Sequence, residues 1–414
     1  MIRIIDHRGA DKLLERRAAS LARAEQVVAP ILQNVRRHGD RALIEYARRF
    51  DGLGDQSLKV QPAELKSALD LAPPELPAAL EQARRNITLF AERQMPREFT
   101  LKLPDGHRAG QVVRPLESAG AYVPAGRYPL PSTLLMTIVP AQVAGVPLLC
   151  ATCPRPGPVI LATAAFLGLN SVFRAGGAQA IAALAFGTET VPRVERIVGP
   201  GNIYVAAAKK LLAGEVGIEF VAGPTEILII SRDGDPRVLA ADMLAQAEHD
   251  EEAAAILVTT SRRLARSVAR EIDKQLETLP TAPTARVAIE RSSAIIVVPG
   301  LDKAVEISNR FAPEHLSIPD GSLLNKIASA GSVFIGPSSP EAAGDYASGP
   351  NHVLPTSGFA RVRAGLSAAD FVKVISVQEL TPKSLKKLAP AITTLARAEG
   401  LEAHARSVEV RLRG

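Results

Sequence analysis

Residues 146–186, VPLLCATCPRPGPVILATAAFLGLNSVFRAGGAQAIAALAF, contain the pattern that decides the fold. Short apolar runs at 148–152 and 171–174 alternate with helical runs at 159–167 and 178–186. The connections between these runs are short and contain glycine or proline. Strands that alternate with helices across short loops are typical of a parallel sheet covered by helices on both faces. The stretch therefore predicts an α/β fold.

The same alternation continues to about residue 225, and a second alternating unit follows it. In the second unit Asp235 is the predicted N-cap of a helix, with Pro236 at the first helical position. Ser261 and Asp302 are the predicted caps of two later helices. The other expected strands are 196–198, 218–221, 227–231, 254–259, 295–298 and 332–335, and the other expected helices are 12–50, 63–93 and 203–212. We therefore predict two doubly wound, Rossmann-like lobes.

The predicted organisation has four parts. Residues 1–24 form a small helical extension at the N-terminus, and residues 367–414 form a helical tail broken at Pro382 and Pro390. Residues 25–121 and 226–366 form the first α/β lobe, which is discontinuous in sequence. Residues 122–225 form the second α/β lobe.

Composition excludes several classes of protein. The 414 residues are 47% hydrophobic, enough for a large core, and the formal net charge of +6 is scattered among acids. A nucleic-acid-binding protein should carry a basic stripe interleaved with aromatic residues, but tryptophan is absent and aromatics make up 4%. No apolar run approaches the roughly 18 residues of a membrane-spanning helix, and the N-terminus lacks a secretory apolar segment. We therefore expect a cytoplasmic protein without a nucleic-acid or membrane partner.

Cys150 and Cys153 are spaced C-x-x-C. A redox-active pair would usually open a helix, whereas Cys150 ends an apolar run and Cys153 precedes Pro154. The alternative, two buried or half-buried thiols at a strand end, is the interpretation that we favour.

Four of the seven histidines lie in short motifs with a carboxylate or carboxamide at fixed spacing. The motifs are Gln246-Ala247-Glu248-His249, Ala312-Pro313-Glu314-His315-Leu316, Gly344-Asp345-Tyr346 followed by Pro350-Asn351-His352, and Glu399-Gly400-Leu401-Glu402-Ala403-His404. Imidazoles and carboxylates bind metals and transfer protons near neutral pH. The pattern therefore predicts an enzyme, and a metal-assisted one.

Each motif taken alone also has a simpler interpretation. Gln246 and His249 share a helix face at i and i+3 and could grip a metal, yet a surface polar patch is the commoner origin of such a pair. Asp345 beside a glycine could be a metal ligand or a turn cap. Glu314 and His315 could act as acid–base groups or belong to an exposed charged loop.

Glycine-rich turns follow three predicted strands. They are Gly176-Gly177-Ala178-Gln179, Gly199-Pro200-Gly201-Asn202 and Ala222-Gly223-Pro224-Thr225-Glu226. Open α/β sheets bind ligands at such positions, so three turns together favour a ligand cleft. None of them has the G-x-G-x-x-G pattern, so the dinucleotide fingerprint is incomplete.

Eight segments in order resemble the histidinol dehydrogenase family. They are residues 120–126 (GAYVPAG), 134–145 (LLMTIVPAQVAG), 176–188 (GGAQAIAALAFGT), 199–205 (GPGNIYV), 246–250 (QAEHD), 312–316 (APEHL), 344–356 (GDYASGPNHVLPT) and 399–404 (EGLEAH). Each segment alone is weakly specific, but eight in sequence over nearly the whole chain are highly specific.

The resemblance implies a zinc- and NAD-dependent, four-electron oxidation of L-histidinol to L-histidine. It implies one Zn²⁺ per subunit, held by residues matching Gln246, His249, Asp345 and His404. It implies that His315 is the base for the hydride-transfer steps and that Glu314 activates water. The implied substrate-binding residues are Thr225, Gln246, His249, His315, Asp345, His352, Glu399 and His404. The catalytic and metal residues of the body then belong to the first lobe.

For the cofactor, the resemblance implies contacts of NAD with Tyr122, Gln179 and Asn202, in the second lobe. It also implies a homodimer in which the C-terminal tail crosses to the partner subunit. Glu399 and His404 would then complete the other subunit's site.

Two positions depart from the family's usual sequence. Ala125 stands where the family usually has glycine, and its methyl group could weaken NAD binding if that backbone needs a positive φ. Thr225 stands where the family usually has serine, and it keeps the hydroxyl on a bulkier, stiffer side chain. Neither change removes a proposed metal ligand or catalytic group.

Two competing hypotheses remain at this point. The first is a paralogue that oxidises another small primary alcohol with the same residues. The second is a non-catalytic protein that binds metal or nucleic acid, which rests only on the net charge. The presence of Glu314 and His315 argues against the second hypothesis, and the presence of Glu399 and His404 argues against the first.

Overall fold

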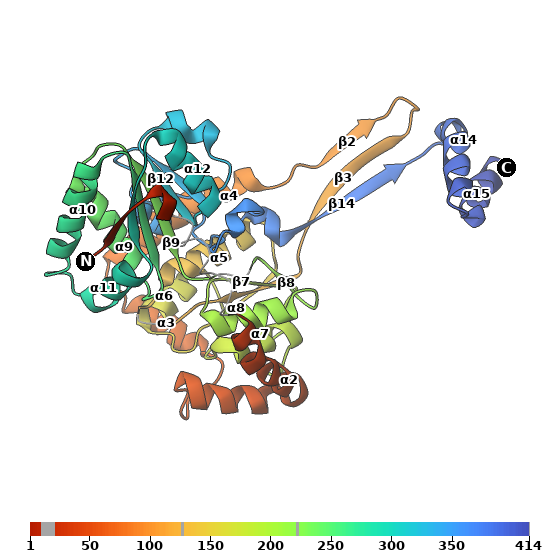
Figure 1. Cartoon of the computed structure of the whole chain (residues 1–414). Helices are drawn as coiled ribbons and strands as arrows, with labels where there is room; N and C mark the ends of the chain where they lie inside the picture. The colour runs from red at the N-terminus through yellow and green to blue at the C-terminus, as the bar shows by residue number, and fades with distance from the viewer. Residues whose placement is uncertain (10–20, 126–127, 221–222, 414) are drawn as a thin grey trace.

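The computed structural model of the chain describes residues 1–9, 21–125, 128–220 and 223–413. One lobe is built on a six-stranded parallel sheet of order β1-β11-β10-β9-β12-β13 (Figure 1). Its strands are β1 (Arg3–Asp6), β9 (Glu226–Ser231), β10 (Ala254–Thr259), β11 (Ala294–Val297), β12 (His315–Ile318) and β13 (Ser332–Ile335). Its helices are α9 (Pro236–Ala247), α10 (Arg262–Gln275), α11 (Ala282–Arg291), α12 (Leu301–Phe311) and α13 (Glu341–Tyr346).

The strand β9 shows how this sheet is buried on both faces. Ile227 and Ile229 pack with α9, α10 and α11, whereas Leu228 and Ile230 pack with α12. Alternate side chains of a strand point to opposite faces, so a continuous apolar run serves two layers of helices at once. The lobe is therefore doubly wound, as predicted.

The second lobe has a five-stranded parallel sheet of order β6-β5-β4-β7-β8. Its strands are β4 (Ser118–Tyr122), β5 (Leu148–Thr152), β6 (Val172–Phe173), β7 (Arg196–Val198) and β8 (Gly217–Ile218). The helices α5 (Pro131–Val143) and α6 (Pro158–Phe166) cover one face, and α7 (Gly177–Phe186) and α8 (Ile203–Leu212) cover the other. The α/β fold class with two Rossmann-like lobes is confirmed.

The N-terminal quarter of the chain differs from the predicted grouping. Residues 3–6 form β1, which pairs with β11, so this end is not purely helical. The helix α2 (Leu21–Tyr46) packs on α7 and α8, α3 (Pro62–Asp70) on α6, and α4 (Glu75–Gln94) on α5. Helices of residues 25–121 thus cover the second lobe, because periodicity reveals an apolar face but not what it packs against. The predicted helix start at residue 12 and strand end at residue 221 lie outside the described residues.

A three-stranded antiparallel sheet extends from the body as an arm (Figure 1). Its strands are β2 (Phe99–Lys102), β3 (Arg108–Pro115) and β14 (Val372–Glu379). Helices α14 (Pro382–Ala398) and α15 (Glu402–Glu409) lie at its outer end with the C-terminus. The prediction of a wholly helical tail is therefore wrong, because β14 pairs with β3 along eight residues.

Several local predictions can be compared with the structure directly. Asp235 and Ser261 cap α9 and α10 by accepting hydrogen bonds from backbone N–H groups, as predicted. Asp302 is not a cap, because Gly300 holds that position and the Asp302 carboxylate pairs with Lys326. Pro390 lies inside α14 without ending it. The predicted elements do not include α5, which is buried on nearly every side and so lacks amphipathic periodicity.

Single turns complete the secondary structure. They are η1 (His7–Gly9), η3 (Ala47–Asp51), η4 (Gly321–Lys326), η5 (Phe359–Arg361), η6 (Ala368–Phe371) and η7 (Val410–Leu412). Within the described ranges, the helices are all too short or too polar to cross a membrane.

The turn after β7 generates a prediction about stability. Gly199 has φ +113° and passes so close to Tyr122 that an added Cβ would lie 2.2 Å from its carbonyl oxygen. Gly214 has a similar φ of +102°, but a Cβ there meets nothing within 4 Å. We expect Gly199→Ala to lower the free energy of unfolding by about 2–5 kcal/mol, and Gly214→Ala by about 1–2 kcal/mol. Urea unfolding measures both, and equal losses would contradict the close approach.

A partly buried acid generates a second prediction. Burial raises the pKa of Asp242, on α9, from 3.8 to about 6. The folded state therefore holds the proton more tightly than the unfolded state, and ionisation costs stability fully above about pH 6 and not at all below 3.8. Allowing for its partial exposure, we expect Asp242→Asn to stabilise the fold by about 1–2 kcal/mol at pH 7 to 8.

The measurement for Asp242→Asn is urea unfolding from pH 4 to pH 8 in chelator, so that no cation offsets the charge. The gain should shrink below pH 6 and vanish near pH 4. The exposed Asp55→Asn is the matched control for the replacement of an aspartate by asparagine. A gain for Asp242→Asn that stays constant across the pH range would disprove the explanation.

Candidate active site

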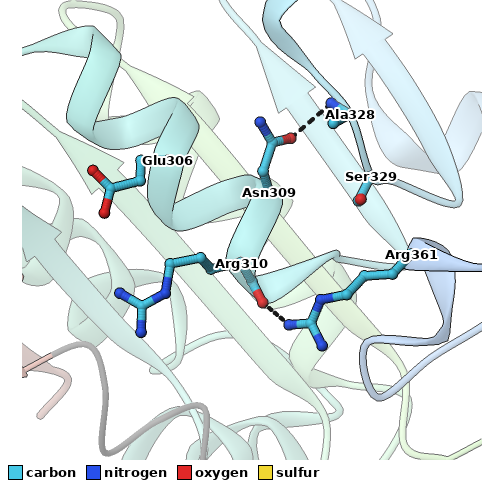
Figure 2. A pocket seen from close by; sticks show the side chains of 6 residues that line it. All are labelled: Glu306, Asn309, Arg310, Ala328, Ser329 and Arg361. Atoms are coloured by element: carbon cyan, nitrogen blue, oxygen red, sulfur yellow. Dashed lines mark hydrogen bonds between the residues drawn. The ribbon is translucent and has the colours of Figure 1, made fainter.

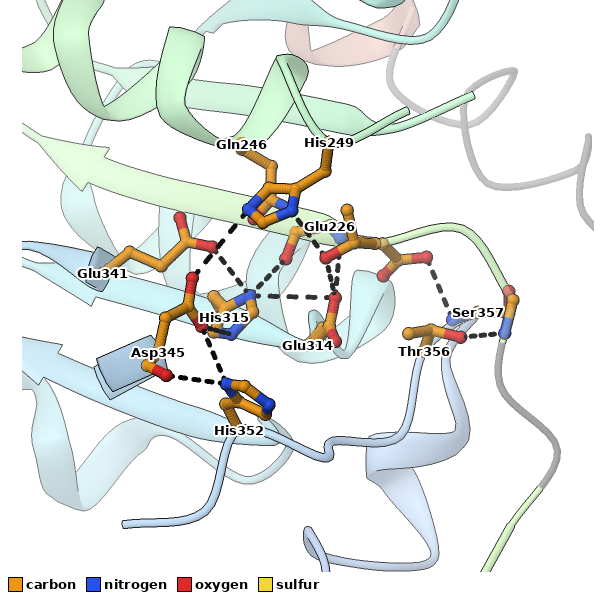
Figure 3. A network of polar contacts seen from close by, with 12 residues as sticks. Glu226, Gln246, His249, Glu314, His315, Glu341, Asp345, His352, Thr356 and Ser357 are labelled. Atoms are coloured by element: carbon orange, nitrogen blue, oxygen red, sulfur yellow. Dashed lines mark hydrogen bonds and ion pairs between the residues drawn. The ribbon is translucent and has the colours of Figure 1, made fainter. Parts of the chain in front are cut away.

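Segments distant in sequence meet at one edge of the six-stranded sheet (Figure 3). Thr225 directly precedes β9, and His315 is the first residue of β12, so both lie at the amino ends of their strands. Gln246 lies in the last turn of α9, and His249 follows that helix closely. The helix α13 brings Asp345 to the same place.

The site lies at the amino ends of these strands, whereas the glycine-rich turns that follow strands predicted a ligand cleft at the carboxyl ends. Ligands of open parallel sheets usually bind at the carboxyl ends of strands. Here α9 runs antiparallel to the sheet, so its C-terminal end and the amino ends of β9 and β12 lie together. The acids and imidazoles gather there.

Two unusual backbone conformations border the site. Among the residues that the structure describes, Ala312 (φ +50°) and Ser357 (φ +55°) are the non-glycine residues with positive φ. Ala312 ends α12 in the left-handed conformation, and Pro313, Glu314 and the start of β12 follow directly. Non-glycine residues in this conformation cost free energy and tend to occur at functional sites.

His315 is buried and held through its Nδ1 atom. That nitrogen lies 3.2 Å from the Glu226 carbonyl oxygen and 3.1 Å from Glu341 Oε1. Since both neighbours are acceptors, Nδ1 carries the hydrogen and Nε2 keeps its lone pair. Nε2 lies 3.8 Å from Asp345 Oδ1. The ring therefore presents a basic nitrogen toward Asp345.

Glu314 is buried beside it and is held by two donors. Its Oε2 accepts hydrogen bonds from the Thr225 hydroxyl at 2.5 Å and from the Glu226 N–H at 2.8 Å. Thr225 Oγ1 also lies 2.7 Å from the Gln246 side-chain amide. Thr225, which replaces the usual serine, thus keeps its hydroxyl in the network.

Asp345 stands among three imidazoles. Its carboxylate oxygens lie 3.8 Å from His315 Nε2, 3.8 Å from His352 Nδ1 and 3.9 Å from His249 Nε2. The His352 Nδ1 atom donates a hydrogen bond to the Asp345 backbone carbonyl at 2.8 Å, so its Nε2 is the basic nitrogen. The carboxylate–imidazole separations are too long for hydrogen bonds and leave room for an ion or a polar ligand group.

Burial controls the charges of this site. It raises the pKa of Glu314, Glu341 and Asp345, and neighbouring carboxylates raise the first two further. It lowers the pKa of His315 to about 3 and of His352 to about 4. Both imidazoles are therefore neutral near pH 7 and available as bases or ligands.

Glu341 is the principal site residue absent from the sequence-based prediction. It is 5% exposed, begins α13, and lies one helical turn before Asp345 on the same face. The i, i+4 spacing of two acids before a histidine is the signal that could have revealed it. Glu341, Asp345 and His315 have ligand atoms within 4.8 Å of one another, which makes them a possible metal-binding group.

The three residues predicted to contact NAD lie at carboxyl ends of strands in the second lobe. Tyr122 ends β4, and its hydroxyl accepts a hydrogen bond from the Gly177 N–H at 3.1 Å. The Gln179 amide donates to Asp51 Oδ2 at 3.0 Å. Asn202 caps α8. In this structure these side chains support glycine turns, and Asp51 is a buried partner that the sequence did not reveal.

Glu399 and His404 lie apart from all these residues. Both are exposed: Glu399 directly follows α14 and His404 lies in the first turn of α15, at the outer end of the arm (Figure 1). A single chain therefore brings Gln246, His249, Asp345, Glu314, His315, His352 and Thr225 together but leaves these two outside.

A hollow beside α12 is not part of this network (Figure 2). Its lining comprises Glu306, Asn309, Arg310, Ala328, Ser329 and Arg361. Asn309 accepts a hydrogen bond from the Ala328 N–H, and Arg361 donates to the Arg310 carbonyl. The lining contains no imidazole, so we place the chemistry in the network of Figure 3.

Two expectations from the sequence, about the cysteines and about Ala125, concern the second lobe and can be compared with the structure. Cys150 and Cys153 are free thiols at 0% and 1% exposure, and burial raises the pKa of each to about 12. The interpretation of two buried thiols at a strand end is confirmed. Ala125 has no positive φ, so its methyl group causes no backbone strain of the kind considered above.

The comparisons with known proteins agree with this geometry. The histidinol dehydrogenase family model matches residues 14–412. Relatives with that name from Bacillus cereus and Geobacter sulfurreducens are 45% and 46% identical, over 93% and 96% of this chain and 91% and 96% of theirs. The crystal structure of histidinol dehydrogenase from Elizabethkingia anophelis has a TM-score of 0.93 at 37% identity, covering 100% of this chain and 98% of that one. The chain therefore belongs to the histidinol dehydrogenase family.

Proposed function

We propose that the chain oxidises L-histidinol to L-histidine with two NAD, as a cytoplasmic enzyme of histidine biosynthesis. The observation that supports this most is the convergence of Glu314, His315 and Asp345, with further imidazoles, in one buried network. Alcohol oxidation requires a base for the hydroxyl proton, and aldehyde oxidation requires an activated water. Both groups are present side by side.

The proposed zinc ligands are Gln246, His249 and Asp345, with His404 from the partner subunit. Zinc binds imidazole nitrogen and carboxylate oxygen at about 2.0–2.2 Å, so one ion can bridge atoms up to about 4.2 Å apart. The 3.9 Å between His249 Nε2 and Asp345 Oδ2 is within this reach. Several buried acids crowd the same place, and a divalent cation would relieve their repulsion. The residues present therefore fit the ion.

His315 is better assigned as the base than as a ligand. Its Nδ1 is held by Glu226 and Glu341, so a metal would have to take Nε2, the nitrogen needed for proton transfer. If a metal ion were bound by His315, Glu341 and Asp345 instead, His315 Nε2 would be occupied by the metal. That nitrogen would then not be available to take the proton of the alcohol.

The reaction then divides into two oxidations. When bound, the ion would supply orientation for the imidazole and amine of the substrate. His315 Nε2 takes the alcohol O–H proton while hydride leaves for the first NAD. Glu314 takes a proton from water that adds to the aldehyde, and the resulting gem-diol gives a second proton and a second hydride. Alcohol, water and two NAD⁺ yield carboxylate, two NADH and three protons.

The remaining substrate and cofactor contacts complete the proposal. Thr225, His352 and the partner's Glu399 hold the substrate, and Tyr122, Gln179 and Asn202 contact NAD. The partner's His404 is the fourth ligand, which makes the working enzyme a homodimer. The exposed position of Glu399 and His404 at the end of the arm supports this arrangement.

We expect about two NADH per L-histidinol, because the aldehyde stays bound until it is oxidised again. Chelation should abolish turnover and added Zn²⁺ should restore it. NADH absorbance at limiting substrate measures the stoichiometry.

His315→Asn is expected to lower kcat by about 10²–10⁴-fold. Turnover of another primary alcohol but not histidinol would favour the paralogue hypothesis, and normal activity of His315→Asn would exclude its role as the base.

We expect two inactive variants, His315→Asn and His404→Asn, to regain activity when their subunits are mixed. In a mixed dimer, one site combines an intact His315 with an intact partner's His404. Random pairing should restore about a quarter of the wild-type activity per subunit, since half of the dimers are mixed and each has one complete site. Differently tagged subunits identify the mixed dimers, and inactivity of purified mixed dimers would rule out a shared site.

A further inference from the structure

We infer that Glu341 is a positioning residue that holds the base His315 and the metal ligand Gln246 in register. This inference rests on the proposed function, which assigns roles to His315 and Gln246 but none to Glu341. The carboxylate of Glu341 lies between these two side chains (Figure 3).

The first contact fixes the base. Glu341 Oε1 lies 3.1 Å from His315 Nδ1, the Glu226 carbonyl oxygen lies at 3.2 Å, and Glu314 Oε2 is more distant, at 3.7 Å. The carbonyl sets the direction of the N–H group, and Glu341 is the nearer of the two carboxyl groups that can carry a negative charge beside it. When Nε2 takes the substrate proton, the imidazolium that forms lies directly beside that charge. A carboxylate on the far nitrogen of a histidine base both orients and stabilises it.

The second contact fixes the amide. Gln246 is fully buried, and its amide nitrogen faces Glu341, since an amide oxygen there would oppose two further oxygens. In this orientation the nitrogen donates to Glu341 Oε1 at 2.5 Å and to Oε2 at 3.2 Å. Glu341 thereby determines that the amide oxygen is the end directed away from it, toward the Thr225 hydroxyl oxygen 2.7 Å away.

The same contacts argue against Glu341 as a metal ligand. Both of its oxygens face donor groups, the His315 Nδ1–H and the Gln246 amide. A cation bound to these oxygens from the side of the two donors would lie against the partly positive hydrogens of both N–H groups. Glu341 also begins α13, one turn before Asp345, so the helix fixes its position relative to a proposed ligand.

The test compares Glu341→Gln with the wild-type enzyme. Glutamine keeps the shape and a hydrogen-bond acceptor but lacks the charge. We expect kcat to fall about 10- to 100-fold, with KM for histidinol and for NAD within about threefold of wild type. We expect zinc content, measured by atomic absorption, to stay at one per chain. Glu341→Asp keeps the charge at a longer distance and should show a kcat above that of Glu341→Gln.

The matched control is Asp242→Asn, which neutralises another acid beside Glu341 without touching His315. It should leave kcat within about twofold. A wild-type kcat in Glu341→Gln would overturn the inference, and zinc loss in that variant would assign Glu341 as a ligand instead. If Glu341→Gln does not fold, kcat and zinc content are measured for Glu341→Asp instead. A reduced kcat with zinc retained would then support the inference. Failure of the wild-type enzyme to oxidise histidinol would instead count against the proposed function.

Discussion

Buried negative charge at the amino ends of β9 and β12 is the constraint on which the site depends. Glu314, Glu341 and Asp345 lie within one cluster, and burial and mutual repulsion raise the pKa of Glu314 and Glu341. Such a cluster is stable only if protons, hydrogen-bond donors or a cation offset the charge. Thr225 and the backbone offer donors, and the imidazoles remain neutral. The polar network is thus arranged around a place for positive charge.

The two sheets supply the rigidity that this cluster requires. Residues from β9, α9, β12 and α13 are far apart in sequence, and each is anchored by an element packed into a core. The left-handed turn at Ala312 delivers Glu314 and His315 directly from a helix into a central strand. An error of about 1 Å in such a site is costly, so placing acid and base at the start of a paired strand limits their freedom.

The sequence revealed the lobes because their strands and helices are continuous apolar runs with short connections. The adjacent acid and imidazole marked Glu314 and His315 as candidates, and their burial excludes the alternative of an exposed charged loop. The sequence did not reveal Glu341, whose importance arises from a contact with His315 that only the fold creates. It also did not reveal β14, because that strand is paired outside the core and its apolar residues do not mark a buried face. Local sequence patterns identify helices and strands, whereas the residues and strands that they contact are determined by how the whole chain packs.

The arm bears on the proposal that a second copy of the chain completes the site. Val374, Ile375 and Val377 on β14 and Phe99 and Leu101 on β2 are all between 46% and 54% exposed. An apolar surface of this kind on a thin projecting sheet is characteristic of a segment that packs against another molecule. A second copy is the partner that supports the proposed function, because the same arm ends in Glu399 and His404. Covering the apolar strands and completing the metal site would then be one event, which couples assembly of the dimer to the ability to bind substrate.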